Sequence, residues 1–397
     1  MKKVYFIGLI FFSFQCRFNS TVKIGVIHSL SGVMASSESY LPYAYQIAAD
    51  EINRKGGVLG KKIEIILADS NSKPETAAML AEKMITQDHV SALFACWTST
   101  CRKALKPVVE KYNSILFYPV QYEGLEESKN IFYTGSVPNQ QIIPAIKWMN
   151  EFGFKRYFLI GSDYFFPRLA NIITRDVIIS NGHQITGEYY IPFNNKIGRN
   201  IIDEIVKNKS DIIINTINGE DNIEFFRAID TLKINGNKIP VLSFSISDYE
   251  LDLMKDISRE GDYSVWGYFQ ILENKENQEF LKVLKKDYPS IKKISEPFLM
   301  AYISLKIWAN AVNYTRSLNT NEIIDNIQYE TMSSPSGPVA IDGQSHHLWK
   351  KVYLGRVNAQ NHMEVVKFSN NLIKPVVFPV YKTKKEWGKI KAEIEYR

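Results

Sequence analysis

The sequence predicts an α/β protein built from two lobes, each with a doubly wound sheet that helices cover on both faces. Three observations lead to this prediction. Short β-branched runs alternate with helical stretches, the alternation restarts after Pro138, and the chain ends in a helical block followed by short strands. The length of 397 residues accommodates two lobes, because a domain takes about 150 residues.

Strands and helices alternate in the first part of the chain. Aliphatic and β-branched residues dominate the strands, whereas Tyr43, Ile47 and Ile52 recur at helical spacing. Pro74 fits the first turn of a helix, where proline is tolerated. The expected strands are 22–28, 62–68, 90–96, 114–118 and 130–133, and the expected helices are 40–54, 73–87 and 99–112.

A second run of the same kind begins after Pro138. Its strands are rich in β-branched residues, and Gly182 ends one of its helices. After Phe269 the rhythm changes, because three helices follow one another without a strand. The expected helices are 139–152, 166–181, 222–232, 278–287, 297–314 and 321–327, and the expected strands are 156–161, 183–191, 211–216, 240–244, 264–269, 337–341, 351–356 and 363–368.

The helical block determines how the lobes divide the chain. Helices without strands cannot form a sheet, so we expect the block to pack onto the first half and the β tail to rejoin the second. The predicted lobes are residues 22–138 with 270–332, and residues 139–269 with 333–397. In this prediction a cleft separates the lobes, and the carboxyl ends of the strands face it.

The charge distribution makes nucleic acid a poor candidate partner. The 48 lysine and arginine residues exceed the 42 aspartate and glutamate residues by six. They are dispersed in short pairs such as Lys285-Lys286 and form no continuous basic stripe. We therefore expect solvated surface lysines and no nucleic-acid site.

The N-terminus has the pattern of an export signal. Two lysines precede an apolar run, Val4–Phe14, which is shorter than the ~20 residues of a membrane-spanning helix. We expect residues 1–15 to be a signal peptide and the remainder to lie in the periplasm or at the outer face of the cytoplasmic membrane. Cys16 is a candidate for lipidation, the single membrane attachment that we expect, although Gln15 departs from the usual small residue. Plain signal cleavage and an uncleaved anchor are the alternatives.

Cys96 and Cys101 are the remaining cysteines, and they are too few for a disulfide framework. Cys96 lies in an expected strand, and Cys101 lies in the turn or helix that follows. A bridge between them is compatible with an oxidising compartment. Two partly buried thiols without a redox role are the simpler interpretation.

No catalytic, metal-binding or cofactor-binding motif stands out, so we expect a protein that is not an enzyme and uses neither metal nor cofactor. The glycine-rich segment 56–62 lies between a helix and a strand, the wrong order for a phosphate loop, and predicts a helix stop with a tight turn. The adjacent His346 and His347 rarely converge on one metal ion. A nucleophilic Cys96 would need a distant histidine such as His28.

Polar and aromatic residues gather where the expected strands end, and these ends meet at one edge of a parallel sheet. Ser99 is also a natural helix N-cap, so its hydroxyl has a structural role that competes with ligand contact. The candidate ligand-binding residues are Trp97, Ser99, Tyr118, Gln121, Tyr164, Asn215, Asn218 and Tyr268.

Several of these segments resemble the periplasmic binding proteins of urea and short-chain amide ABC transporters, in the amide branch of the type I family. The resemblance extends from about Val22 to about Val357, and YPVQYEG and GSDYFFPR are its most specific parts. It implies the type I periplasmic-binding fold, in which three crossovers form the hinge between the lobes. The segments are IHSLSGVMA, CWTSTCRKAL, FYPVQYEGLEESKNIFYTG, PNQQIIPA, GSDYFFPR, NTINGEDN and GPVAIDGQSHHLWKKV.

The resemblance also implies roles for individual residues. Ser99, Tyr118 and Tyr164 match family positions that touch a small amide, and Gln121 is similar to the urea-binding branch. Asn215, Asn218 and Tyr268 lie where the second lobe and the hinge face the cleft. The family's cytoplasmic amide sensors, which regulate amidase expression, share the YP, YEG and GSDYxxPR elements.

The function implied is that of an importer component, which binds urea, acetamide or formamide, closes on it and delivers it to a membrane permease. Such neutral ligands need hydroxyls, amides and aromatic walls rather than a buried charge. The alternatives are an amide sensor, a branched-chain amino-acid-binding protein and an amide hydrolase. Amino-acid binding requires a partner for the ammonium group, which Asp248 or Glu250 could supply, although Asp248 also fits a helix-start cap.

Overall fold

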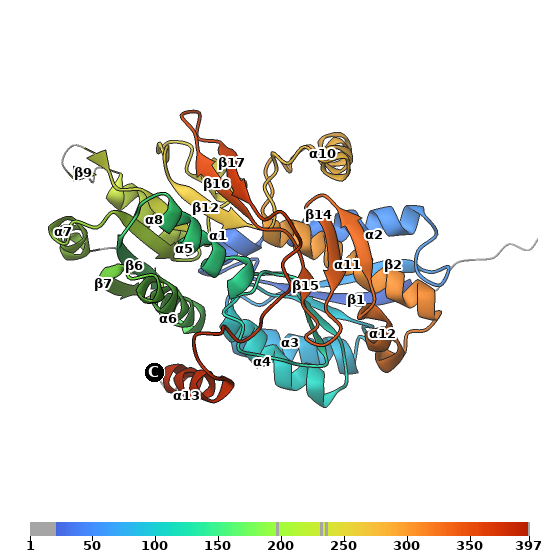
Figure 1. Ribbon diagram of the computed structural model, residues 1–397. Helices are drawn as coiled ribbons and strands as arrows, with labels where there is room; N and C mark the ends of the chain where they lie inside the picture. The colour runs from blue at the N-terminus through green and yellow to red at the C-terminus, as the bar shows by residue number, and fades with distance from the viewer. Residues whose placement is uncertain (1–20, 196–197, 231–232, 235–236, 396–397) are drawn as a thin grey trace, which may run out of the picture.

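The computed structural model describes residues 21–195, 198–230, 233–234 and 237–395. Two α/β lobes, each with its own large sheet, lie at opposite ends of the molecule (Figure 1). The predicted signal peptide, residues 1–15, and Cys16 lie outside the described residues. Within the described part, no helix is long and apolar enough to cross a membrane.

The first lobe contains a fully parallel sheet. Its strands are β1 (Thr21–His28), β2 (Lys62–Asp69), β3 (Leu93–Ala95), β4 (Leu116–Tyr118) and β5 (Ile131–Tyr133). Their order is β2-β1-β3-β4-β5, and β3, β4 and β5 are buried throughout. Continuous apolar strands are typical of a parallel sheet that helices cover on both faces.

Helices from both ends of the chain cover this sheet. They are α1 (Ala35–Glu38), α2 (Pro42–Arg54), α3 (Pro74–Thr86), α4 (Ser99–Lys111), α10 (Lys275–Asp287), α11 (Glu296–Thr315) and α12 (Thr320–Ile327). Helices α2 and α11 pack together, as do α3 and α4, and the two pairs lie on opposite sides of the sheet (Figure 1). The Trp308 ring on α11 meets Phe94 of β3 edge-on, with centroids 6.4 Å apart. The helical block therefore packs onto the first half, as the sequence predicts.

A small antiparallel sheet extends the same core. It consists of β13 (Thr331–Ser334), β14 (Gly337–Ile341) and β15 (Leu348–Trp349). Val339, Ile341 and Leu348 are buried together with residues of α11 and the first sheet. The lobe boundaries assigned from the sequence stay a prediction.

The second lobe contains a mixed sheet in the order β17-β16-β12-β11-β8-β6-β7. Its strands are β6 (Arg156–Ser162), β7 (Gln184–Ile191), β8 (Ile212–Thr216), β11 (Val241–Ser243), β12 (Tyr263–Trp266), β16 (Tyr353–Val357) and β17 (Met363–Phe368). Strand β16 runs antiparallel to β12, so β16 and β17 of the expected tail join this sheet, whereas the expected tail strand 337–341 is β14 of the small sheet on the first core. A separate ribbon pairs β9 (Lys233–Ile234) with β10 (Asn237–Lys238).

Alternate residues of β6 enter two different hydrophobic clusters. Tyr157 and Leu159 pack with α5 and α6, whereas Phe158 and Ile160 pack with α7, α8 and α9 on the other face. The helical elements of this lobe are η1 (Pro138–Gln140), α5 (Ile142–Glu151), α6 (Phe165–Ser180), α7 (Arg199–Lys207), α8 (Glu220–Ile229), α9 (Asp248–Leu253) and α13 (Lys384–Glu395). Helices α7, α9 and α13 were not predicted from the sequence.

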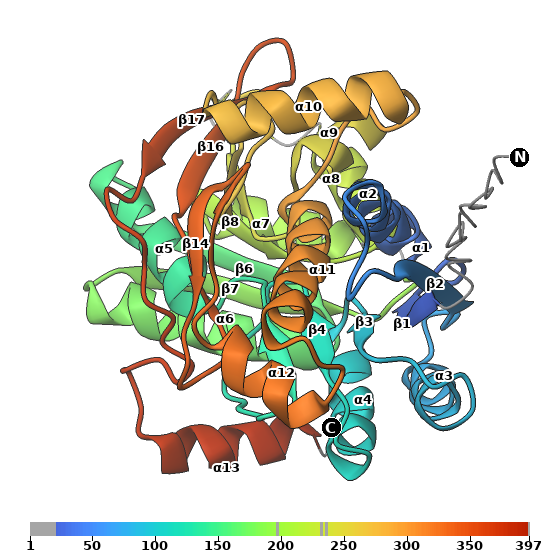
Figure 2. The ribbon, with the colours of Figure 1, turned by 90° about the vertical axis from the view of Figure 1, so that its right-hand side faces the viewer.

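Three segments connect the lobes, after β5, after β12 and after β15. One buried carboxylate contacts all three. Glu296 Oε1 accepts hydrogen bonds from Ser136 Oγ at 3.0 Å and from Lys350 Nζ at 2.8 Å. Glu296 Oε2 accepts from the Gly267 amide at 2.5 Å. Figure 2 shows these connecting segments passing beside α11. The Glu296 carboxylate therefore holds the three connecting segments of the hinge against one another.

Candidate ligand-binding site between the lobes

The carboxyl ends of strands from both sheets meet between the lobes. Trp97, directly after β3, donates from Nε1 to Oδ1 of Asn218, which follows β8, at 3.2 Å. Gln121, which follows β4, donates from Nε2 to the carbonyl of Phe244, after β11, at 3.0 Å. The structure therefore places three of the candidate residues at the boundary between the lobes.

Other contacts also join the two lobes. Tyr40 stacks on Tyr249 of α9 with ring centroids 3.7 Å apart. The Lys103 ammonium lies 4.2 Å from the centroid of Phe165 at the start of α6. These contacts bring side chains of the two lobes directly against one another.

A pocket of about 370 Å³ lies where α4, α6 and α13 meet. Burial lowers the pKa of Lys103 to about 8, and its ammonium pairs with Glu395. Arg168 pairs with Asp163 at 2.6 Å. The pocket is lined by Thr100, Lys103, Asp163, Tyr164, Phe165, Arg168, Ile394 and Glu395.

Tyr164 connects this pocket to the boundary between the lobes. Its ring stacks on Phe193 at 5.4 Å. Burial raises the pKa of the Tyr164 hydroxyl, and Tyr118 on the opposite lobe raises it further. The hydroxyl therefore stays protonated and can donate to a carbonyl oxygen.

Ser99 belongs to a buried charge network rather than to a helix cap. Thr98 is the N-cap of α4 and accepts from the Cys101 amide at 3.2 Å, so the N-cap interpretation of Ser99 is wrong. The Ser99 hydroxyl instead donates to Glu123 Oε2 at 2.6 Å and accepts from Arg102 at 3.1 Å. Glu123 lies 24 residues after Ser99 in the sequence. Local residue spacing therefore could not identify this role of Ser99.

Arg102 is the centre of that network and is fully buried. It donates to Glu123 at 2.8 Å and to Glu126 at 3.0 Å, and it lies 4.2 Å from the Tyr122 ring centroid. Burial alone would raise the pKa of Glu126, but the Arg102 guanidinium outweighs this effect and lowers it to about 2. All three charges are therefore compensated within the protein.

Tyr118 lies between this network and the segment after β3. Its hydroxyl donates to the carbonyl of Trp97, and Arg102 lies 4.8 Å from its ring centroid. Burial raises the pKa of the Tyr118 hydroxyl, so the group is a neutral donor whose oxygen can still accept. Tyr118 thus fixes the backbone that carries Trp97.

Two candidate residues do not present polar groups between the lobes. Asn215 donates to Asn222 at 2.8 Å and to Ser243 at 3.1 Å, which fixes the end of β8. Tyr268 belongs to the first core, and its hydroxyl donates to Asn277 at 2.8 Å. Their polarity is explained by these internal bonds, which a single sequence does not reveal.

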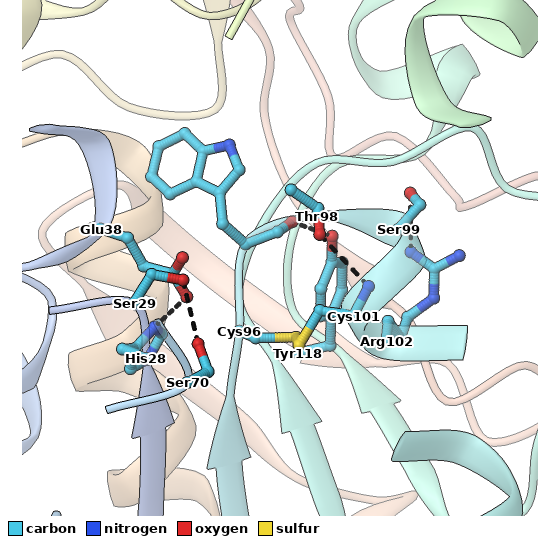
Figure 3. Close-up of a disulfide and its surroundings, with 11 residues drawn as sticks. His28, Ser29, Glu38, Ser70, Cys96, Thr98, Ser99, Cys101, Arg102 and Tyr118 are labelled. Atoms are coloured by element: carbon cyan, nitrogen blue, oxygen red, sulfur yellow. Dashed lines mark hydrogen bonds and ion pairs between the residues drawn. A yellow bond between two sulfur atoms is a disulfide. The ribbon is translucent and has the colours of Figure 1, made fainter. Parts of the chain in front are cut away.

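The buried pair His28 and Glu38 was not among the predicted site residues. His28 Nδ1 lies 2.9 Å from Glu38 Oε1, and Ser29 and Ser70 share a hydrogen bond of 3.0 Å beside it (Figure 3). Among the described residues, nothing hydrogen-bonds to the buried His28 Nε2. The position of this pair was indicated in the sequence by the two polar residues His28 and Ser29 at the end of the apolar strand β1.

Cys96 and Cys101 form a disulfide, with Cα atoms 6.4 Å apart. The interpretation as two free thiols is therefore wrong. Parallel pairing of Ile27 with Ala95 brings His28 next to Cys96, but the sulfur of Cys96 is already bonded and cannot act as a thiolate nucleophile.

The remaining motifs have structural roles. Gly57 has φ +78°, and a Cβ there would lie 1.9 Å from the Lys61 carbonyl, as a tight turn requires. His347 stacks on Tyr133 at 4.3 Å, and burial lowers its pKa to about 3. Within the described residues, no cluster of three metal-ligating side chains occurs.

A family model described as "Periplasmic binding protein domain" matches residues 22–384. The chain belongs to the periplasmic binding protein family. The Leu/Ile/Val-binding protein homolog 6 of Brucella suis is 20% identical over 375 residues, covering 90% of this chain and 93% of that protein. The limonene hydroxylase of Geobacillus stearothermophilus is 31% identical over 106 residues, and this match spans 27% of the chain and 19% of that protein.

Comparison of this periplasmic binding protein with solved structures confirms the predicted type I fold. The structure of a Rhodopseudomonas palustris ABC-transporter solute-binding protein, in complex with 4-hydroxybenzoate, superposes with a TM-score of 0.80. It is 20% identical and covers 89% of this chain and 98% of its own. The arrangement of two α/β lobes, each with its own large sheet, is therefore that of the type I fold.

Proposed function

We propose that this periplasmic binding protein is the extracytoplasmic solute-binding component of an ABC importer and that it binds urea or a short-chain amide between its lobes. Its membership of the family supports the transport role, and a permease is the partner that this role implies. Closure of the lobes on the ligand is the signal that the permease would read.

The side chain of Gln121 is the main support for urea or a short amide as the ligand. Its amide nitrogen binds the second lobe, whereas its carbonyl oxygen is buried and has no hydrogen-bond partner among the described residues. A buried acceptor without a partner is costly, and an N–H group of urea or an amide would satisfy it. The Tyr164 hydroxyl is a donor for the ligand carbonyl.

The charges at the boundary favour a neutral ligand. Arg102 is paired with Glu123 and Glu126, and Glu38 is paired with His28. These pairs leave neither Arg102 nor Glu38 free as a counter-ion for a charged ligand.

Amino-acid binding is the second candidate. Glu250 Oε1 is buried without a hydrogen-bond partner among the described residues, and burial raises the pKa of this carboxyl. An ammonium group would relieve both effects. Ser247 is the N-cap of α9 and forms a capping box with Glu250, so the N-cap interpretation of Asp248 is wrong. Asp248 instead accepts from the Gln270 amide at 3.2 Å.

Calorimetry with urea, acetamide, formamide, leucine and 4-hydroxybenzoate tests the proposal. We expect binding of at least one of the first three and none of the last two. Gln121→Leu should weaken that binding by about fivefold, because one hydrogen bond contributes ~1 kcal/mol. Gln141→Leu is the matched control, since Gln141 also donates to the Phe244 carbonyl. Leucine binding without amide binding would overturn the ligand class, and retention of the protein in the cytoplasm would favour an amide sensor.

A further inference from the structure

The disulfide between Cys96 and Cys101 encloses part of the candidate site. Residues 97–100, which lead from β3 into α4, lie inside the small loop that the bridge closes. Both cysteines are buried. Figure 3 shows the bridge beside Tyr118, at the end of the neighbouring strand.

The enclosed segment makes contacts in two directions. The Trp97 carbonyl accepts from the Tyr118 hydroxyl in the same lobe. The Trp97 indole reaches Asn218 in the other lobe. The path of the backbone from Cys96 to Ser99 therefore determines whether the indole meets its partner when the lobes close.

The start of α4 does not depend on the bridge. The Thr98 side chain caps the helix through the Cys101 amide, and Leu105 and Val109 anchor its buried face. A bridge between residues separated by five positions constrains an unfolded chain less than a bridge that closes a long loop. Its main effect is therefore on the geometry of the enclosed segment rather than on the stability of the lobe.

We propose that the Cys96–Cys101 disulfide is a positioning element for ligand binding, which holds residues 97–99 in the path that brings Trp97 to Asn218. Ligand affinity then depends on the bridge, and this part rests on the proposed function. A dithiol that reduces the bridge breaks the S–S bond, supplies two electrons and two protons to give two thiols, and is itself oxidised to a cyclic disulfide.

The first experiment needs no ligand. Amide hydrogen exchange of residues 96–102 is compared in wild type, in the double variant Cys96→Ser/Cys101→Ser and in Thr98→Ala. We expect exchange about tenfold faster in the double variant across this segment, because one covalent restraint is lost. Thr98→Ala removes the helix cap but keeps the bridge, so we expect faster exchange at the helix start alone.

The second experiment measures affinity for urea and acetamide by calorimetry. We expect about tenfold weaker binding in the double variant, since an unrestrained segment must be ordered when the ligand binds. Reduced wild type should regain its affinity after reoxidation, whereas reduced and alkylated protein should not. Unchanged exchange in the double variant, or affinity within twofold of wild type, would overturn the proposal. Equal losses of affinity in Thr98→Ala and the double variant would also overturn it, because they would indicate general destabilisation.

If wild type binds none of urea, acetamide and formamide, the proposed ligand is wrong. The exchange experiment still decides whether the bridge positions the segment.

Discussion

Gly219 brings the backbone of the second lobe against the first. It is the N-cap of α8, with φ +70° and ψ −155°. A Cβ at this position would lie 2.6 Å from the carbonyl oxygen of Val33, in the loop that leads to α1. Helices α1 and α8 lie side by side across the boundary (Figure 1). Gly219→Ala therefore tests whether this contact belongs to the closed form.

Two effects of this substitution can be separated. The φ and ψ values of Gly219 are unfavourable for alanine, which destabilises the fold by about 1–3 kcal/mol whether the lobes are open or closed. The contact with Val33 is made between lobes, so its overpacking penalty of about 1–3 kcal/mol acts when they close. A penalty of ~2 kcal/mol on closure weakens ligand affinity about thirtyfold.

Gly182→Ala is the matched control. Gly182 follows α6 with φ +75°, and a Cβ there would meet nothing within 4 Å. Affinity is measured by calorimetry with the ligand that wild type binds. The separation of the lobes is measured by electron paramagnetic resonance between spin labels at the exposed Met79 and Val206. We expect both variants to lose stability, but only Gly219→Ala to lose affinity and to show wider lobe separation with ligand. Equal affinities in the two variants would show that the contact between Gly219 and Val33 does not act on closure.

Three further predictions concern buried charges. Arg102→Met leaves two carboxylates without their counter-ion, so the free energy of unfolding should fall by about 3–5 kcal/mol in guanidinium denaturation, and a change below 1 kcal/mol would contradict this account. Burial opposes ionisation of Glu126, but Arg102 lowers its pKa from 4.5 to about 2, so its stabilisation is present above pH 4.5 and is lost as the pH falls towards 2. Thermal unfolding of Glu126→Gln against pH should therefore be flatter than wild type over this range, and an identical acid slope would argue against it. Glu296→Gln weakens the buried contact to Lys350, so we expect a broader distribution of lobe separations in the same spin-label experiment, and an unchanged distribution would exclude a hinge role.

The regular elements follow from short-range patterns. Val22–His28 and Asp211–Thr216 are runs of β-branched residues, and both form buried strands within one residue of the predicted bounds. Helix α13 was missed although Trp387, Ile390 and Ile394 recur at helical spacing, because charged residues make up most of the stretch and Trp387 is its one fully buried side chain. A helix with so narrow an apolar stripe is stabilised mainly by its tertiary contact with α6.

The site was predictable in position more than in chemistry. Trp97, Gln121 and Asn218 were predicted from their location after strands, and they lie at the boundary between the lobes. Ser99 and Asn215 follow strands as well, but partners brought by distant segments use their polar groups. A single sequence does not show which hydrogen-bond partner a hydroxyl or amide side chain will have in the fold.

Local sequence thus determined the alternation of strands and helices, the restart after Pro138 and the polar residues at the strand ends, because hydrophobic periodicity and turn residues act over a few positions. Tertiary structure alone decided that Cys96 bonds to Cys101, that Arg102 is neutralised by Glu123 and Glu126, and that one carboxylate, Glu296, joins the three crossovers. The ion pairs and the Glu296 contacts arise between segments that the fold brings together, and their energy depends on burial, which no local pattern specifies.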